Sequence, residues 1–438
     1  MSFNTLGLSP AILRALAELG HDTPTPVQLS AIPLVLAGND VLAAAQTGTG
    51  KTGGFALPIL ERLFPGGKRD NALQRNPRVL ILTPTRELAA QVHESLRAYG
   101  KHLGVRSTTI FGGVGMQPQV DAVRRGLDVL IATPGRLIDH IDRRTVDLSG
   151  VNCLVLDEAD RMLDMGFMPA LKRILAVLPR QQRQTLMFSA TFSDEIKKLA
   201  AQFLRDPREV QVTPRNTIAA NISHLVHPVD AARKRDLLVD VLAKDSRRQT
   251  LVFSRTKHGA DKLTTVLMVS GFKAAAIHGN KSQGARTKAL ADFKSGRITI
   301  LVATDIAARG LDIPQLPVVV NYDLPMVAED YVHRIGRTGR AGEDGQAISL
   351  VCQDEAHLLR DIQRLLKQEI HIENFPGFTP SQALRVDTAT KPPAPGKSRP
   401  AQHARRGHVE SKGNKPGGHA KSHSKSQGQR RTFSSARA

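Results

Sequence analysis

The chain has 438 residues, of which 41% are hydrophobic and 4% aromatic, and its formal net charge is +21. This length suits two globular domains with an appendage, and no window reaches the roughly 18 consecutive apolar residues of a membrane-spanning helix. Two isolated cysteines, Cys153 and Cys352, lie in apolar runs and predict core residues rather than a disulfide framework or a metal site. With no leader-like segment at the amino terminus, we expect a soluble chain in a reducing, cytoplasmic compartment.

A phosphate-binding loop is predicted at residues 45–52, after the apolar strand candidate 40–44. The sequence AQTGTGKT departs from the usual pattern only in having Ala45 where a first glycine is expected. Glycines let backbone N–H groups point at the phosphates, Lys51 adds a positive charge, and the Thr52 hydroxyl can ligate a metal. The alternative is a glycine-rich helix entry that binds nothing.

An alternation of strands and helices follows along the chain. Apolar runs at 79–82, 129–131, 153–156 and 185–188 alternate with helical patterns such as 86–99 and 170–178. This spacing predicts a parallel sheet wrapped by helices, in which ligands bind at the carboxyl ends of the strands. The candidate motifs at those ends are PTRELA (84–89), TPGR (133–136), DEAD (157–160) and SAT (189–191).

The acidic tetrad 157–160 leaves the tip of a predicted buried strand. Two adjacent carboxylates there suit a nucleoside triphosphatase, because one can hold magnesium while the other orients the attacking water. Acids after an apolar run are also how an ordinary strand enters a solvated loop. The phosphate loop upstream decides between these readings in favour of the triphosphatase.

A second α/β unit follows a polar, Pro-containing stretch that we interpret as a linker. Its strands are predicted at 250–253, 274–277, 300–303, 318–320 and 347–350, and it has no second phosphate loop. The segments TDIAARGLD (304–312) and HRIGRTGR (333–340) stand at strand ends. The basic residues of the latter are either a solvated turn or arginines delivered to a γ-phosphate held by the first unit.

The carboxyl-terminal stretch is strongly basic. Residues 391–438 contain twelve Lys or Arg and the single acid Glu410, about half of the excess charge. Few large apolar residues are present to offset the entropy of ordering, so we predict a disordered tail that binds polyanions, RNA first among them, through counterion release. The alternative is a tail that only solubilises the chain.

Taken in order, these motifs resemble the series of DEAD-box ATP-dependent RNA helicases over roughly residues 1–375. The short N-terminal lead and the basic tail look most like the bacterial RhlE subgroup. The resemblance implies two tandem RecA-like parallel-sheet domains: 1–213 with a Q motif at 1–29, a linker at 214–221, a second domain at 222–376, and the tail at 377–438. It also implies ATP and Mg²⁺ as cofactors, RNA as partner, and ribosome assembly or RNA decay machinery as the setting.

The family's site residues can be carried over to matching positions. Catalytic roles fall on Lys51, Asp157, Glu158, Arg337 and Arg340. ATP binding falls on Phe3, His21, Gln28, Ala45, Gln46, Thr47, Gly48, Thr49, Gly50, Lys51, Thr52 and Asp305, with Thr52 and Asp157 toward the metal. Coupling of hydrolysis to domain closure falls on Asp160, Ser189, Thr191 and His333. RNA contacts fall on Pro84, Thr85, Arg86, Gly113, Thr133, Gly135, Arg136, Arg255, Gln283, Arg286 and Thr304.

One position departs from the family. His21 stands where the family usually has Phe or Tyr to stack on adenine, and its smaller ring should weaken that contact. The mechanism implied is cooperative closure, in which ATP and single-stranded RNA favour the same closed state and a short duplex melts locally. Two alternatives remain open: a DNA-directed helicase of the same superfamily, and an RNA-binding or annealing module whose nucleotide site is only regulatory.

Overall fold

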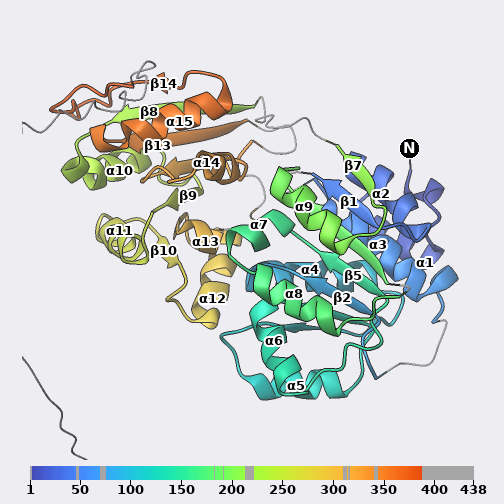
Figure 1. Ribbon diagram of the computed structural model, residues 1–438. Coiled ribbons are helices and arrows are strands. Elements are labelled where there is room, and N and C mark those ends of the chain that lie inside the picture. The colour runs from blue at the N-terminus through green and yellow to red at the C-terminus, as the bar shows by residue number, and fades with distance from the viewer. Residues whose placement is uncertain are drawn as a thin grey trace, which may run out of the picture. The chain divides into compact units, whose positions relative to one another are not determined.

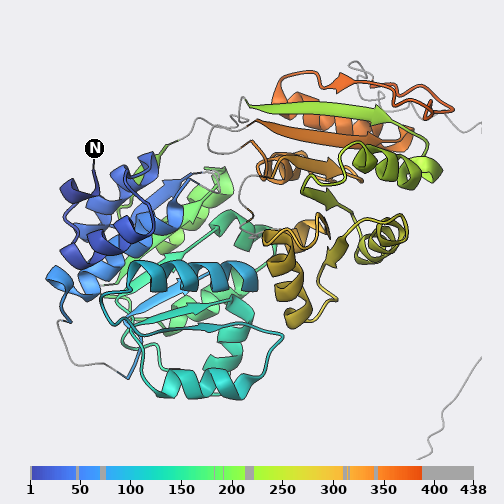
Figure 2. The ribbon, with the colours of Figure 1, turned by 180° about the vertical axis from the view of Figure 1, so that it is seen from behind.

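The computed structural model describes residues 2–45, 49–69, 75–181, 183–190, 192–212, 221–308, 313, 316–339 and 344–386. Their elements form two parallel seven-stranded sheets, one in residues 2–212 (lobe 1) and one in residues 221–386 (lobe 2). Figures 1 and 2 show both sheets with helices on their two faces. The prediction of two tandem parallel-sheet domains is therefore confirmed. None of the described helices is long and apolar enough to cross a membrane.

Lobe 1 has strand order β3-β4-β2-β5-β6-β1-β7. Its strands are β1 Val41–Ala44, β2 Val79–Leu82, β3 Ser107–Ile110, β4 Val129–Ala132, β5 Cys153–Leu156, β6 Gln184–Ser189 and β7 Arg208–Gln211. Its α-helices are α1 Pro10–Glu18, α2 Pro26–Leu36, α3 Lys51–Leu63, α4 Arg86–Tyr99, α5 Met116–Arg124, α6 Pro134–Asp142, α7 Ala159–Asp164, α8 Met168–Val177 and α9 Asp194–Phe203. The short 3₁₀ turns η1 Phe3–Thr5 and η2 Pro65–Gly67 complete it.

Lobe 2 repeats the arrangement with strand order β10-β11-β9-β12-β13-β8-β14. Its strands are β8 Ile222–Pro228, β9 Thr250–Phe253, β10 Ala274–Ile277, β11 Ile300–Ala303, β12 Val318–Asn321, β13 Gly345–Val351 and β14 His371–Ile372. Its α-helices are α10 Lys234–Ala243, α11 Lys257–Val269, α12 Gln283–Lys294, α13 Asp305–Ala308, α14 Ala328–Ile335 and α15 Ala356–Leu366. The 3₁₀ turns are η3 Ala231–Arg233 and η4 Gln353–Glu355.

Each central strand is buried on both faces because helices cover both sides of its sheet. In lobe 1, side chains of α1 to α4 form a core against one face, and side chains of α5 to α9 form a core against the other. Figure 2 shows α4 in front of its sheet, and Figure 1 shows α6, α8 and α9 on the opposite side. This two-sided burial explains the continuous apolar runs that made β2, β4 and β5 predictable.

Three features differ from the sequence predictions. Strands β3, β7, β8 and β14 are additional, and β3, β7 and β14 contain half-exposed or exposed residues that give no apolar run. Cys153 is buried in β5 as predicted, but Cys352 follows β13 and is only partly buried, so its assignment to the core is wrong. The tail does not start at 377, since Phe378 lies in a hydrophobic core and Leu384 packs against another. The predicted linker and the rest of the tail lie almost wholly outside the described residues.

Candidate nucleotide and RNA site

The order of strands in lobe 1 brings the phosphate loop, the acidic tetrad and the SAT segment to one edge. Strand β6 lies between β5 and β1, with Leu156 beside Met187 and Ala44 beside Ser189. The residues that follow β5 and β1 therefore emerge one strand apart, with SAT between them. The predicted meeting of these motifs at the carboxyl ends of parallel strands is what the register gives.

Three buried ionisable side chains lack hydrogen-bond partners at this edge. Lys51 Nζ, Asp157 Oδ1 and Glu158 Oε2 have none among the described residues, and the three residues are 7%, 2% and 5% exposed. Burial raises the pKa of Asp157 to about 7, opposed by the Lys51 charge and reinforced by Glu158. A buried polar atom without a partner is costly, so such a group points to a ligand that supplies the missing contacts.

The backbone holds these side chains in unusual conformations. Glu158 adopts the left-handed region (φ 53°, ψ 55°), which a residue with a Cβ rarely occupies. This turn directs the chain sharply from β5 into α7. Gly50, at φ +88°, caps α3, and a Cβ there would lie 2.7 Å from the Gln28 amide nitrogen. Both positions fit a turn that must place side chains against a ligand.

Of the residues predicted to contact adenine, Gln28 bonds to the phosphate loop. Gln28 accepts a hydrogen bond from the Thr25 backbone (2.9 Å) and donates one to the Gly50 carbonyl (3.0 Å), so it joins α2 to the phosphate loop. His21 is exposed, with its ring 6.2 Å from that of Tyr99. Phe3 is buried in the hydrophobic core of lobe 1. Gln46, Thr47 and Gly48 lie outside the described residues.

Asp160 bonds to the segment predicted as its coupling partner, though through an atom that the sequence did not single out. Its Oδ2 accepts a hydrogen bond from the Ala190 backbone (3.0 Å), and its Oδ1 accepts one from the Arg161 backbone (3.0 Å). Ser189 is fully buried, and Thr191 lies outside the described residues. The contact from the acidic tetrad to SAT is thus a backbone hydrogen bond.

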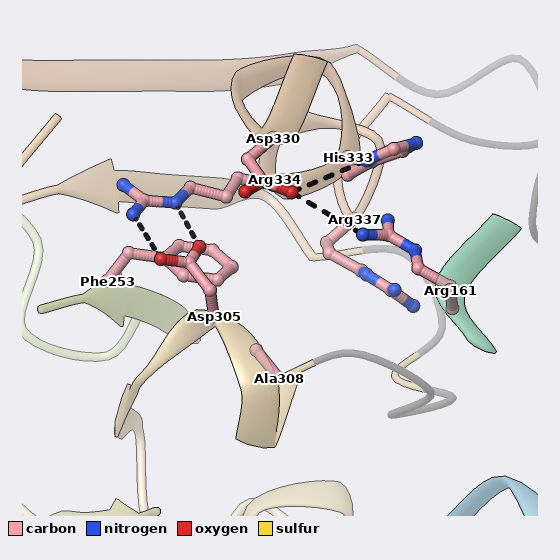
Figure 3. A pocket seen from close by; sticks show the side chains of 8 residues that line it. All are labelled: Arg161, Phe253, Asp305, Ala308, Asp330, His333, Arg334 and Arg337. Carbon is pink, nitrogen blue, oxygen red and sulfur yellow. Dashed lines mark hydrogen bonds and ion pairs between the residues drawn. The ribbon is translucent and has the colours of Figure 1, made fainter. Parts of the chain in front are cut away.

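In lobe 2, Figure 3 shows a pocket with side chains from β9, α13 and α14, together with Arg161 of lobe 1. Arg334 is 2% exposed and binds Asp305 with two hydrogen bonds of 2.6 and 2.7 Å. It also donates to the Asn321 side chain and the Asp323 carbonyl. Asp305, predicted to touch a ribose, is therefore held in place by a buried arginine that the sequence did not distinguish from its neighbours.

The predicted arginine finger Arg337 lines the same pocket and is 5% exposed, while Arg340 lies outside the described residues. His333 Nδ1 lies 3.7 Å from Asp330 Oδ1, longer than a hydrogen bond. Burial is the main cause that lowers the pKa of His333, so its imidazole is neutral near pH 7. The part of α14 that lines the pocket therefore places a neutral histidine next to a carboxylate and several guanidinium groups.

Predicted RNA residues of the two lobes contact one another. Arg86 donates to the Gln283 amide oxygen (3.3 Å), Gln283 donates to Glu87 (2.9 Å), and Arg286 binds Glu87 at 2.8 Å. Glu87 was not among the predicted site residues, although it stands inside the PTRELA motif next to Arg86. The signal that could have found it is charge: a buried acid between two basic groups of the same predicted surface.

The remaining RNA candidates lie at strand ends and helix starts. Thr85 caps α4 through its hydroxyl, and Thr133 precedes α6, where exposed Gly135 leaves the first turn open to a phosphate. Gly113 has φ +78°, and a Cβ there would collide with the Arg86 guanidinium. The others are Pro84, Arg136, Arg255 and Thr304, with Arg136 bonded to the Val114 carbonyl and Arg255 to Glu355.

Two equivalent parallel-sheet lobes, one with a phosphate loop and paired acids and the other with buried arginines, define the class of two-lobed helicase-type nucleotide-binding proteins. The DEAD/DEAH box helicase family matches residues 25–199, and the helicase conserved C-terminal domain matches residues 233–342. The chain belongs to the DEAD/DEAH box helicase family.

Several known proteins are similar to this chain. DEAD-box ATP-dependent RNA helicase 30 of Arabidopsis thaliana is 45% identical over 361 residues, which cover 82% of this chain and 60% of that protein. ATP-dependent RNA helicase DeaD of Mycobacterium tuberculosis is 43% identical over 386 residues, covering 88% and 67%. The structure of S. cerevisiae Dbp5 bound to RNA and ADP BeF3 is 31% identical with a TM-score of 0.76, covering 85% of this chain and 95% of that one. The chain spans about three fifths of the length of some of these curated relatives.

Proposed function

We propose that the protein is an ATP-dependent RNA helicase that locally unwinds short RNA duplexes or remodels RNA–protein complexes. Hydrolysis would be coupled to closure of the two lobes on single-stranded RNA. The observation that carries this proposal is the group of buried atoms on Lys51, Asp157 and Glu158 that have no hydrogen-bond partner among the described residues, which a polyanion and a water molecule would satisfy. The names of the similar helicases, and the RNA and ADP BeF3 bound by Dbp5, support it.

The donor set fits magnesium. Asp157 Oδ1 is a buried carboxylate oxygen without a partner among the described residues, and the Thr52 hydroxyl lies in the first turn of α3. The described residues contain no cluster of three or more His, Cys, Asp or Glu that could hold a metal alone. Magnesium is usually held by one or two carboxylates together with substrate phosphates, which matches this set. When bound, the ion supplies positive charge to the phosphates.

The roles of the chain's own groups follow from their positions. Lys51 would neutralise the phosphates, Glu158 would orient the attacking water, and Arg337 would add charge from lobe 2 during phosphoryl transfer. Arg340 keeps its predicted role as a second arginine finger. On the RNA side, backbone amides at the starts of α4 and α6 and the side chains of Arg86 and Arg286 would hold phosphates and sugars. Such contacts read shape rather than sequence.

A Glu158→Gln variant tests the enzyme reading. The amide keeps the size of the side chain but removes the charge that orients water, so we expect kcat for ATP hydrolysis to fall by about 10²–10⁴-fold. Binding of a fluorescent ATP analogue should be retained. Glu94→Gln, which changes an exposed residue of α4, is the matched control. Unimpaired unwinding of an RNA duplex by Glu158→Gln would favour the annealing module with a regulatory nucleotide site. Stronger stimulation of wild-type ATP hydrolysis by DNA than by RNA would favour the DNA-directed helicase.

The basic tail is proposed to add affinity for RNA without sequence selectivity. A truncation should end after Val386, because Ser381 binds Asp230 through its backbone and hydroxyl and Val386 packs on lobe 2. We expect this truncation to weaken RNA binding and to flatten its salt dependence, while basal ATP hydrolysis stays unchanged. An unchanged salt dependence would leave the tail only a solubilising role. Membership of the RhlE subgroup, a cytoplasmic location, and a place in ribosome assembly or RNA decay stay predictions.

A further inference from the structure

An ion pair joins α7, the helix that includes the end of the acidic tetrad, to α14, the helix that carries the start of the HRIGRTGR segment. Arg161 Nη1 on α7 of lobe 1 lies 3.5 Å from Asp330 Oδ1 on α14 of lobe 2 (Figure 3). The side chains are 4% and 18% exposed. Neither residue was among the predicted catalytic, coupling or RNA-binding residues, and the roles proposed above do not use them.

We propose that Arg161 and Asp330 are positioning residues that fix α7, and with it Asp157 and Glu158, against the arginines of lobe 2 when the lobes close. This inference rests on the proposed helicase function. It assigns to the pair the task of joining lobe closure to the geometry of hydrolysis.

The carboxylates near the Arg161 guanidinium make its ion pair with Asp330 depend on closure of the lobes. The other carboxylate near its guanidinium is Asp164 of the same helix, at 4.0 Å and with a 48% exposed side chain. A buried guanidinium needs a close counter-charge to offset its lost hydration. In this structure Asp330 provides that charge at 3.5 Å, and separation of the lobes would remove it and leave the more exposed Asp164 at 4.0 Å.

Asp330 is prepared for this contact within its own lobe. It stands in the first turn of α14, where the helix dipole stabilises a negative charge. His333 follows it at i+3, and Arg334 on the same helix is fixed by Asp305. The carboxylate is therefore carried by a helix that Arg334 ties to Asp305, and it lines the same pocket as Arg161 and Arg337.

Arg161 transmits the contact to the acidic tetrad through a short path. Its backbone N–H binds the Asp160 carboxylate, and Asp160 in turn binds Ala190. Helix α7 has six residues and starts directly after Glu158, whose left-handed conformation makes the preceding turn tight. A rotation of α7 therefore changes the directions of Asp157 and Glu158, and the pair with Asp330 opposes that rotation.

A charge-swap cycle tests the proposal on the full chain. The variants are Arg161→Asp, Asp330→Arg and the double swap, and the rates are RNA-stimulated kcat and the KM for ATP. We expect each single variant to lower kcat at least about fivefold with little change in KM, and the double swap to recover most of the loss, since contacting charges couple by this order. The exposed pair Arg173–Asp142 of lobe 1, at 2.7 Å, provides the matched cycle and should leave kcat unchanged.

Asp330→Asn and Asp330→Glu keep the test informative if a reversed charge prevents folding. The amide should lower kcat while leaving the thermal midpoint near that of wild type, and the glutamate should restore kcat. Additive effects in the swap, or wild-type kcat in Asp330→Asn, would overturn the proposal. If wild type shows no stimulation by RNA, the helicase function fails instead, and the same variant-to-wild-type ratios are then taken from the basal rate.

Discussion

In lobe 1, three buried ionisable groups, Lys51, Asp157 and Glu158, present atoms without hydrogen-bond partners among the described residues, whereas in lobe 2 the buried Arg334 donates to three different residues. The two groups of residues lie at comparable ends of sheets with the same strand order. The difference lies in what completes them. Lobe 1 leaves its charges for a ligand to satisfy, and lobe 2 satisfies Arg334 internally so that Asp305 is held rigid near Arg337.

This contrast predicts that the unsatisfied charges of Lys51, Asp157 and Glu158 serve activity and that the satisfied charge of Arg334 serves stability. A binding site with unsatisfied polar atoms gives up stability that its ligand restores, as is common where function requires strained or uncompensated groups. A satisfied buried arginine is different, because removing it leaves its acceptors without donors.

The largest effect is expected for Arg334→Gln. The change leaves Asp305 near a buried site without its cation and removes the donors to Asn321 and Asp323, so lobe 2 should lose about 3–5 kcal/mol of unfolding free energy. Two of the three tyrosines, Tyr322 and Tyr331, belong to lobe 2, so tyrosine fluorescence during urea unfolding follows mainly this lobe.

Arg297→Gln is the control for this substitution, because Arg297 makes an ion pair with Asp292 but is 68% exposed. Its loss should change stability little, as for most exposed pairs. Equal midpoints for the two variants would break the contrast between the lobes. The companion measurement is Glu158→Gln, which should lower hydrolysis without lowering the unfolding midpoint.

A smaller effect is expected from the titration of Asp157. Burial raises the pKa of this carboxyl to about 7, so below that pH it carries a proton that magnesium must displace. The apparent affinity for Mg²⁺ in the presence of an ATP analogue should therefore fall about tenfold for each pH unit below 7 and level off above it. Magnesium titrations of analogue fluorescence between about pH 5.5 and 8.5 measure this.

Asp157→Asn separates the protein's titration from that of the nucleotide phosphates. The variant should bind magnesium weakly at every pH, and the ratio of wild-type to variant affinity should carry the dependence on Asp157 alone. A ratio that is flat across the range would mean that the carboxyl is already ionised in the free protein, and that Lys51 satisfies it better than its geometry indicates.

The sequence predicts the lobes well and their charged interiors poorly. The runs at β2, β4, β5 and β11 are apolar at every position because both faces are covered, and this pattern is readable without a structure. The polar edge strand β7 gives no such pattern. Motif positions such as Lys51 and Glu158 could likewise be placed at strand ends from their neighbours in the chain.

The sequence does not show which charged residue of a motif is buried, or which residue it binds. Arg334 and Arg337 lie three residues apart in one basic stretch and line the same pocket, yet it is Arg334 that binds Asp305 with two hydrogen bonds. Glu87 binds Arg286, which lies 199 positions later in the chain, and Asp330 binds Arg161, which lies 169 positions earlier. Such pairings depend on long-range contacts and on side-chain direction, neither of which has a local signature.

The smallest effect is expected at Glu18, where charge is exposed instead of buried. Lys101 and then Arg14 lower the pKa of Glu18 to about 2, well below that of the free side chain. A depressed carboxyl pKa stabilises the fold above the unfolded value of 4.5, and this contribution is lost as the pH falls from there toward 2. Glu18 joins the end of α1 to the segment after α4, but its side chain is 36% exposed and solvent screens the pair.

Glu18→Gln should therefore shift the midpoint of acid unfolding upward by only a fraction of a pH unit and leave stability at pH 7 slightly reduced, with Glu94→Gln as the control. A large loss at pH 7 would show that exposed charge in lobe 1 is as important for stability as the buried charge of lobe 2, and the contrast would then follow burial less than position in the fold.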